Sequence, residues 1–401
     1  MRIALPVALV LAVASGCAPA IPPLPGKGGP AWIELESDHF TIWTDAGKER
    51  GTELMKEVED LRQVVIGTAF RGAAGDGRGF IIAFANDSEI HAYLSDMFAA
   101  MTIGGGGPFG APLIVLSANS NSQNIDRTTT HELVHLISYG VIHRQPHWFA
   151  EGIAKYFETI EIDARAGTAD VGRAATGRDG HVIPLPHLTS VDAIMQCQQQ
   201  RCMNGNFYAT AWALFTYLAN VRPADLAKLE ALLDQSPGDG RAAFAQVFGA
   251  DGTTVIDGEM RRWLQNGSHT VLHFDVHLAS HDVRTAPLAD ADVLAARAML
   301  TSHLRRDKTV ATQQIDAALA LDPTDVMARI VELGLPRPHD AAGARATAAA
   351  HPGDWRAWLL LVTAAPTADE QAAARVKLCE LAAAHPTNGV PALLCPTAPP
   401  S

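Results

Sequence analysis

Two histidines four residues apart, with a glutamate and two apolar residues between them, constrain this 401-residue chain more than any other feature. The stretch runs from His131 to His135 and reads HELVH. Because residues four apart lie on the same face of an α-helix, both imidazoles can reach one metal ion. Zinc suits neutral imidazole nitrogens and lowers the pKa of a bound water. Glu132 lies beside the open metal position, where it can take the proton of that water.

The neighbouring residues predict two successive helices. Asp126 is typical of a helix N-cap, and the first helix is expected to run from there to Tyr139 and to end at Gly140. Pro146 fits the first position of a second helix, with the sequence HWFAEGIAKYFETI. Glu151 lies in this second helix. One interpretation of Glu151 is a surface glutamate paired with Lys155 four residues on.

The segment HELVH followed by PHWFAEGIAKYF resembles the gluzincin clan of zinc peptidases, in particular the peptidase MA-like families of exported bacterial proteins. In that clan, a glutamate on the helix after HExxH supplies the third metal ligand, within a W-x-x-E-G-x-A-like segment. Those places are occupied here by Trp148, Glu151, Gly152 and Ala154.

The resemblance implies one Zn²⁺ per chain, held by His131, His135 and Glu151, with Glu132 as the general base. It also implies an α+β zincin-like catalytic domain, with a mixed sheet and the HExxH helix. The likeness is best over residues 31–159 and extends loosely to Gln265. The gap between His135 and Glu151 is shorter than in thermolysin-like members, so a tight connecting loop is expected.

Further site residues follow from the same resemblance. Tyr208, in the segment FYATAW, is a candidate donor to the oxyanion, and a core or interface tyrosine is the alternative. His143 and His147 lie close to the site in sequence and are otherwise loop or surface histidines. The strand Leu113–Ser117 resembles the edge strand on which the clan lays an extended substrate, and a plain sheet strand is equally consistent with it. The preceding glycine loop is either a lid or a surface loop.

The first residues predict export and lipid anchoring. A charge at Arg2, a short apolar run and the sequence ASGC indicate a lipoprotein signal peptide over residues 1–17, with Cys17 as the lipidated residue. An ordinary signal peptide is the alternative. Residues 18–30 are rich in Pro and Gly and are expected to form a tether. The protein is therefore expected in the bacterial cell envelope, facing the periplasm or the exterior. Ala18 favours the outer membrane, and the N-terminal lipid is the expected membrane contact.

The net charge bears on the binding partners of the chain, and the cysteines bear on its covalent cross-links. The net charge is −12 and there is no long basic run, which argues against nucleic acid. Cys197, Cys202, Cys379 and Cys395 form two locally close pairs, and in an exported chain two disulfides are expected. A second metal site at the first pair and free thiols are the alternatives.

Periodicity divides the rest of the chain into three predicted parts. Residues 31–160 begin with two strands, WIELES and HFTIWT, and form the α+β zinc peptidase lobe. Residues 161–275 are expected to form a helical second lobe. Residues 286–401 repeat a helix, a Pro turn and a helix, with prolines about 30 residues apart, close to the ~34-residue period of tetratricopeptide (TPR) repeats. A TPR-like helical-hairpin domain is predicted, and an ordinary helical bundle is the alternative.

The leading functional hypothesis is a zinc-dependent endopeptidase acting on a peptide or protein substrate. One alternative is a non-catalytic envelope scaffold that binds a protein partner through its C-terminal helices. Another is a zinc hydrolase of a different amide, because the HExxH motif defines the activated water better than the substrate.

Overall fold

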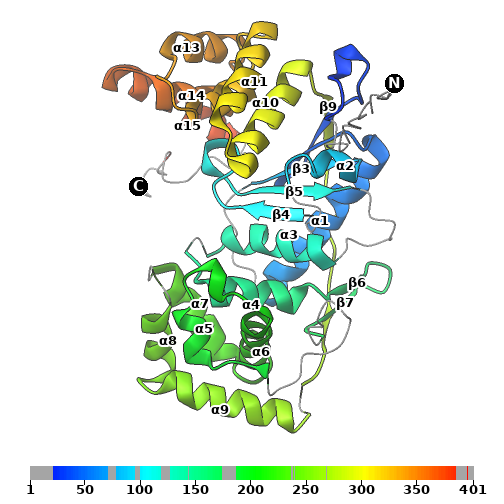
Figure 1. The fold of residues 1–401 in the computed structure, drawn as a ribbon, viewed down its shortest axis with the longest axis vertical. Coiled ribbons are helices and arrows are strands. Elements are labelled where there is room, and N and C mark those ends of the chain that lie inside the picture. The colour runs from blue at the N-terminus through cyan, green and yellow to red at the C-terminus, as the bar shows by residue number, and fades with distance from the viewer. Residues whose placement is uncertain are drawn as a thin grey trace, which may run out of the picture.

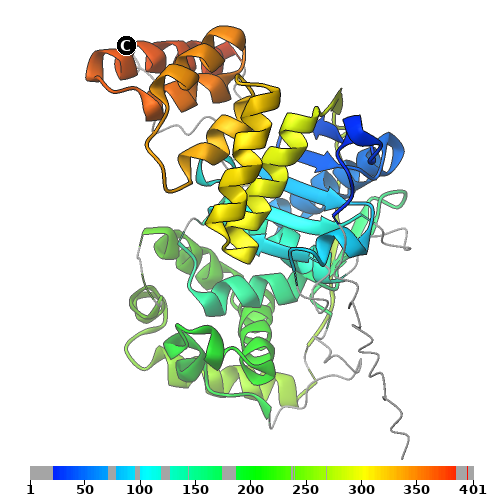
Figure 2. The ribbon, with the colours of Figure 1, turned by 45° about the horizontal axis from the view of Figure 1, so that its top comes forward.

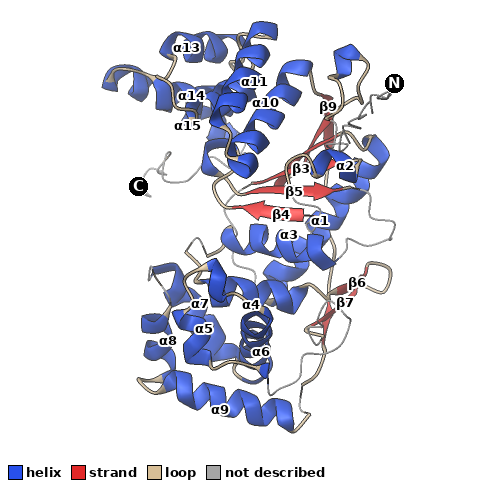
Figure 3. Ribbon diagram, viewed as in Figure 1, coloured by secondary structure: helices blue, strands red, loops and turns tan. Residues whose placement is uncertain are grey.

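A computed structural model of the chain describes most of the sequence and shows a mixed α/β fold. The described residues are 21–70, 78–94, 100–118, 127–142, 144–173, 187–235, 238, 240–267, 269–384 and 395. A sheet lies near the middle of the molecule, with a helical lobe below it and the C-terminal helices above it in the view of Figure 1. The predicted combination of a mixed sheet with many helices is confirmed at this level (Figure 3).

The central sheet has six strands in the described residues, in the order β4-β5-β3-β2-β1-β9. Strands β2, β3 and β5 run parallel, whereas β1, β9 and β4 are antiparallel to their neighbours. The predicted strand pair WIELES and HFTIWT is confirmed as β1 and β2. The strands are β1 (Ile33–Glu36), β2 (Phe40–Thr44), β3 (Gly79–Phe84), β4 (Ala100–Ile103), β5 (Leu113–Ser117) and β9 (Arg284–Pro287).

Both faces of the central sheet are buried. Successive side chains of a strand point to opposite faces, and each of the two sets packs against its own layer of helices. Ile81 and Ile114 point to the face covered by α1 (Lys48–Thr68) and α3 (Arg127–Tyr139). Ile82 and Val115 point to the other face and belong to a second apolar cluster. Near-continuous runs such as GFIIAF in β3 are the sequence signature of such a doubly covered strand.

The second face is covered by helices from the C-terminal third of the chain, which lie across the strands in Figure 2. They are α10 (Asp290–Leu300), α11 (Lys308–Leu321) and α12 (Val326–Leu333). The domain boundary that the sequence placed at Ala286 falls inside β9, which pairs with β1. The helices after it therefore share a core with the sheet. Their apolar faces gave no sign of which surface they cover.

The tether expected over residues 18–30 is also corrected where the structure describes it. Pro25–Lys27 form a short 3₁₀ turn, and the Gly26 amide donates to the Asp290 carboxylate at 2.8 Å. Leu24 is buried in the cluster shared by α10 and the sheet. Proline and glycine in this stretch therefore shape a turn that packs on the fold. The signal peptide and Cys17 lie outside the described residues.

The lower lobe is mainly helical and is joined to the sheet by one continuous core. A three-stranded antiparallel sheet, β6-β7-β8, flanks it. The helices are α4 (His147–Phe157), α5 (Val191–Gln196), α6 (Gly205–Val221), α7 (Pro223–Gln235), α8 (Arg241–Phe248) and α9 (Gly252–Gln265). The strands are β6 (Glu161–Asp163), β7 (Thr168–Val171) and β8 (Leu272–Asp275). The short helix α2 (Asp87–Ile90) follows β3.

The last helices are α13 (Ala341–Ala350), α14 (Trp355–Ala364) and α15 (Ala368–Ala384), and they enclose an apolar cluster of their own. Disulfide bonds join Cys379 to Cys395 here and Cys197 to Cys202 in the lower lobe. Among the residues that the structure describes, no helix has the length and apolarity required to cross a membrane.

Buried charges tie the C-terminal helices to the sheet layer. Arg297 of α10 donates to Glu89 of α2 at 3.0 Å, and both side chains are almost fully buried. Nearby, Asp325 at the start of α12 caps that helix through the Ala328 amide and lies against Asp292 of α10. Burial, and next the charge of Asp292, raise the pKa of Asp325 to about 7.

This carboxyl pair predicts a pH-dependent stability. The pKa of Asp325 is about 7 in the folded chain, against about 3.9 unfolded. The protonated form therefore contributes stability at acidic pH, and that stability is lost as the pH rises through 7. Asp325→Asn keeps a capping oxygen without the charge. We expect it to be more stable than the wild type by on the order of 2 kcal/mol at pH 8, and similar to it at pH 5.

Urea unfolding at the two pH values measures the difference. Asp307→Asn is the matched control, because Asp307 caps α11 in the same way, through the Val310 amide. It should change stability equally at both values. An Asp325→Asn effect that does not depend on pH would contradict the role assigned to the pair.

Candidate metal centre

Helix α3 carries the two histidines, and its sequence explains how they face away from the core. Leu133, Val134 and Leu136 are buried against the sheet. His131 and His135, four residues apart, lie together on the side of α3 that faces α4, and their rings are 4.8 Å apart between centroids. The pattern of apolar residues around the histidines therefore fixes the direction in which both imidazoles point.

Helix α4 begins after Pro146 and brings Glu151 to the same place. Pro146, predicted as the first residue of this helix, is its N-cap, and α4 begins one residue later, at His147. Trp148 and Phe149 are buried in the lower core and anchor the helix. A Cβ on Gly152 would lie 2.7 Å from the backbone oxygen of Ala211 in α6. The glycine after Glu151 is thus required by the close approach of α4 and α6.

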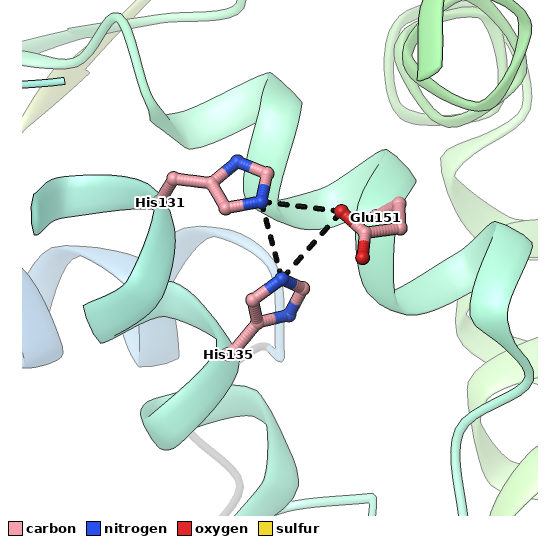
Figure 4. Close-up of side chains that lie close together, drawn as sticks. All are labelled: His131, His135 and Glu151. Atoms are coloured by element: carbon pink, nitrogen blue, oxygen red, sulfur yellow. Dashed lines mark hydrogen bonds and ion pairs between the residues drawn. The ribbon is translucent and has the colours of Figure 1, made fainter. Parts of the chain in front are cut away.

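His131, His135 and Glu151 converge on one point, as Figure 4 shows. The Nε2 atom of His131 lies 3.1 Å from Oε2 of Glu151 and 3.2 Å from Nε2 of His135. Nε2 of His135 lies 3.6 Å from the same carboxylate oxygen. Within the described ranges, this is the one group of three or more His, Cys, Asp or Glu side chains arranged to hold a metal ion.

The spacing of these three atoms fits a metal ion. Ligands about 2.1 Å from a tetrahedral zinc ion lie about 3.4 Å from one another, and the observed separations range from 3.1 to 3.6 Å. The two nitrogens and the oxygen also come from the residue types that zinc prefers. The spacing supports a metal site. It does not identify the metal, for which the types of the donor atoms are the guide.

The charges of the three side chains stabilise one another. Burial lowers the pKa of His131, but the carboxylates of Glu151 and Glu158 outweigh it and raise that pKa to about 9. Burial alone would raise the pKa of Glu151, and the two imidazoles hold it well below its usual range. The carboxylates of Glu151 and Glu158 therefore favour a positive charge among these side chains, as a bound metal ion would supply.

Glu158 is a residue of the site that sequence reasoning missed. It follows α4, is buried, and places Oε2 3.3 Å from Nδ1 of His131 and 2.7 Å from Nζ of Lys155. Lys155 therefore pairs with Glu158 and not with Glu151, contrary to the surface-pair interpretation. A carboxylate on the far nitrogen of a metal-binding histidine fixes its tautomer and orientation. Its spacing of seven from Glu151, two helical turns, was the available signal.

Glu132 lies beside the two imidazoles and is held by the sheet. The Thr102 amide of β4 donates to Oε2 of Glu132 at 2.8 Å, and the Thr102 hydroxyl donates to the Glu132 carbonyl oxygen at 2.9 Å. Strand β4 was missed because its four residues precede a run of glycines. Among the described strands β4 is one of the two edge strands of the central sheet, and Leu113–Ser117 is β5, an inner strand. The expectation that Leu113–Ser117 forms the edge is therefore wrong.

Two tyrosines border the site. Burial, followed by the charges of Glu151 and Glu132, raises the pKa of Tyr208 to about 12. The Lys155 ammonium lies 5.9 Å from the centre of the Tyr208 ring. Tyr139, at the end of α3, stacks on His135 with 6.2 Å between ring centroids, and the same two glutamates raise its pKa after burial. Tyr139 was not predicted, although its spacing of four from His135 places it on the same helix face.

The other residues that the sequence offered for the site are two histidines and a cysteine pair. His147 is exposed at the start of α4, and His143 lies outside the described residues. The sulfurs of Cys197 and Cys202 are bonded to each other, so they do not act as metal ligands.

Comparison with known proteins shows that part of this region is similar to one protein family. Residues 125–237 match a family model described as a protein of unknown function (DUF1570). The match spans both helices of the metal centre and extends through α6, which carries Tyr208, and it covers less than a third of the chain. No curated protein matches the chain. The family description states no activity.

The metal centre predicts a defined metal content. Protein lacking the first 20 residues should contain about one metal ion per chain by elemental analysis. Both His131→Ala and Glu151→Ala should lose it, because each removes one of three converging ligands. His147→Ala is the control and should retain it, since His147 is exposed. Metal retained in Glu151→Ala would exclude Glu151 as a ligand.

Glu158 predicts a second, weaker effect. Glu158→Ala should fold and bind the metal with an affinity about 10- to 100-fold lower, because His131 loses the group that orients it. Competition with a chromogenic chelator measures the change. The matched control is Glu161→Ala, which removes an exposed carboxylate from β6 that pairs with Arg173. Equal affinities for Glu158→Ala and wild type would contradict this role.

Proposed function

We propose that the protein is a zinc-dependent endopeptidase of the gluzincin type, with a zincin-like catalytic domain. The observation that carries the proposal is the convergence of His131, His135 and Glu151 within 3.6 Å, with Glu132 next to the first ligand. The donor set favours zinc over magnesium or calcium, which prefer oxygen ligands. Binding of a metal ion alone would not require a carboxylate at position 132. The presence of Glu132 therefore supports a hydrolytic site.

His131, His135 and Glu151 would hold the zinc ion, which would act as a Lewis acid toward a carbonyl and lower the pKa of a bound water to about 7. The chain supplies the proton transfer. Glu132 takes the proton of the attacking water and passes it to the leaving amine. The Thr102 amide fixes one oxygen of Glu132 at 2.8 Å, which leaves the other oxygen for this transfer.

Tyr208 is the proposed donor to the oxyanion. Like any tyrosine with an ordinary or raised pKa, Tyr208 keeps its hydroxyl protonated at neutral pH, so that it can donate. The same two glutamates whose charges raise this pKa, Glu151 and Glu132, border the reaction centre. Tyr139 is the competing tyrosine, and its stacking on His135 favours a packing role.

The substrate is proposed to be a peptide in extended form. Strand β4 is one edge of the central sheet in the described part of the chain and contacts α3 through Thr102 and Glu132. A strand edge binds an extended segment through backbone hydrogen bonds, and a peptide on β4 would use backbone groups other than the Thr102 amide, which donates to Glu132. Such binding recognises the peptide backbone, which supports an endopeptidase over a hydrolase of small amides.

The proposed setting is the bacterial cell envelope, with Cys17 as the lipid-bearing residue. The two disulfide bonds support an oxidising compartment, because such bonds rarely persist in the cytosol. An envelope scaffold that binds a protein through its C-terminal helices is the second candidate function. Its support is that α13, α14 and α15 form a separate apolar cluster beyond the sheet layer (Figure 1).

Glu132→Gln tests the mechanism. The variant keeps the size of the side chain and all three ligands, so it should retain zinc while hydrolysis of unfolded, fluorescein-labelled casein falls by at least about 100-fold. Wild type and His147→Ala should both cleave casein, and removal of zinc by a chelator should abolish cleavage. An active Glu132→Gln protein would refute the role of Glu132. A wild type that binds zinc and cleaves nothing would favour the scaffold.

A further inference from the structure

The loop between β4 and β5 contains a strained residue. Phe109 has φ 52° and ψ 30°, in the left-handed backbone region that residues other than glycine rarely adopt. A bulky residue held there costs about 1–2 kcal/mol. Such a conformation persists only when its surroundings hold it, so the contacts of Phe109 indicate what the loop is attached to.

The ring of Phe109 is attached to the C-terminal helices. It packs both on the apolar cluster of α10, α11 and α12 and on the cluster of α13, α14 and α15. Its centroid lies 6.2 Å from the ring of Trp355, the first residue of α14, at an interplanar angle of 40°. Within the loop, the Gly107 amide donates to the Ala111 oxygen at 2.7 Å. The tip of the hairpin is thus anchored to helices far along the sequence.

The other end of the same loop reaches the metal centre. Thr102 is the third residue of β4, one position before the strand ends, and its amide holds the carboxylate of Glu132. Four consecutive glycines, at positions 104–107, follow the strand. Glycines lose more conformational freedom on ordering than other residues, so they cannot hold β4 in place by themselves. The nearest bulky side chain beyond them is the ring of Phe109.

We propose that Phe109 is a positioning residue for the metal centre. Its ring, held by Trp355, fixes the β4–β5 hairpin against the C-terminal helices, and the hairpin in turn fixes Glu132 through the Thr102 amide. The structural part of this proposal stands independently, and its catalytic part rests on the proposed peptidase function. It gives the C-terminal helices a role at a site to which, among the described residues, they supply no metal ligand.

Phe109→Gly is the informative variant. Glycine accepts the left-handed backbone without cost, so the fold of the loop is retained while the ring is lost. Arg306→Gly is the matched control, because Arg306 is an exposed residue with φ 55° and the same strain is relieved there. Trp355→Ala removes the anchor from the other side. Phe109→Tyr retains an aromatic ring and should rescue.

Hydrogen exchange of the Ala100–Ile103 amides tests the structural part on the zinc-loaded protein. Phe109→Gly and Trp355→Ala should each accelerate exchange of the Thr102 amide by about tenfold or more, because β4 opens more readily without its anchor. Arg306→Gly and Phe109→Tyr should exchange as the wild type does. Unchanged exchange in Phe109→Gly, or equal acceleration in Arg306→Gly, would overturn the proposal.

Cleavage of casein and of a quenched peptide taken from its digest tests the catalytic part. Phe109→Gly should retain zinc and show a kcat about tenfold lower, equivalent to about 1.4 kcal/mol, with Phe109→Tyr close to wild type. A kcat unchanged in Phe109→Gly, with wild-type cleavage intact, would refute the positioning role and leave the peptidase assignment standing. No cleavage by the wild type would refute the peptidase function, and the exchange experiment would still decide the anchor.

Discussion

The packing of α3 against α4 is the constraint on which the rest of the site depends. A carboxylate and two imidazoles taken out of water are unfavourable unless they meet one another or a cation. They meet because Gly152 lets α4 lie close to α6, and because the apolar face of α3 leaves its histidines on the side facing α4. A bulkier residue at position 152 would separate the helices and leave the charge of Glu151 without its partners.

The central sheet links this site to the ends of the chain. Its two faces bury different sets of residues, one under α1 and α3 and the other under α10, α11 and α12. Strand β9 joins the opposite edge from β4, so a segment after residue 280 completes a sheet that begins at Ile33. The second face of the sheet is therefore covered by segments from the C-terminal third of the chain, and these helices share a core with the sheet that carries β4.

Local patterns were sufficient to predict β1, β2, β5 and the two helices of the metal centre, because periodicity and end signals lie within a few residues of each element. The convergence of Glu151 with the histidines was inferred from a resemblance, and the geometry agrees with a metal site. The covering of the sheet by α10, the edge position of β4 and the role of Glu158 were not predicted. Each depends on contacts between segments distant in sequence, and an apolar helix face does not state which surface it covers.

The β4–β5 hairpin shows why such distant contacts matter for chemistry. The proposed general base, Glu132, would work only if its carboxylate were held in a narrow range of positions. The amide that holds it belongs to a four-residue strand followed by four glycines. A flexible connection of this kind transmits position only if its far end is fixed. The strained backbone of Phe109 indicates that its ring contacts outweigh the strain, and those contacts are made with helices that bear no ligand. The precision of the metal centre is thus distributed over residues from position 102 to position 355.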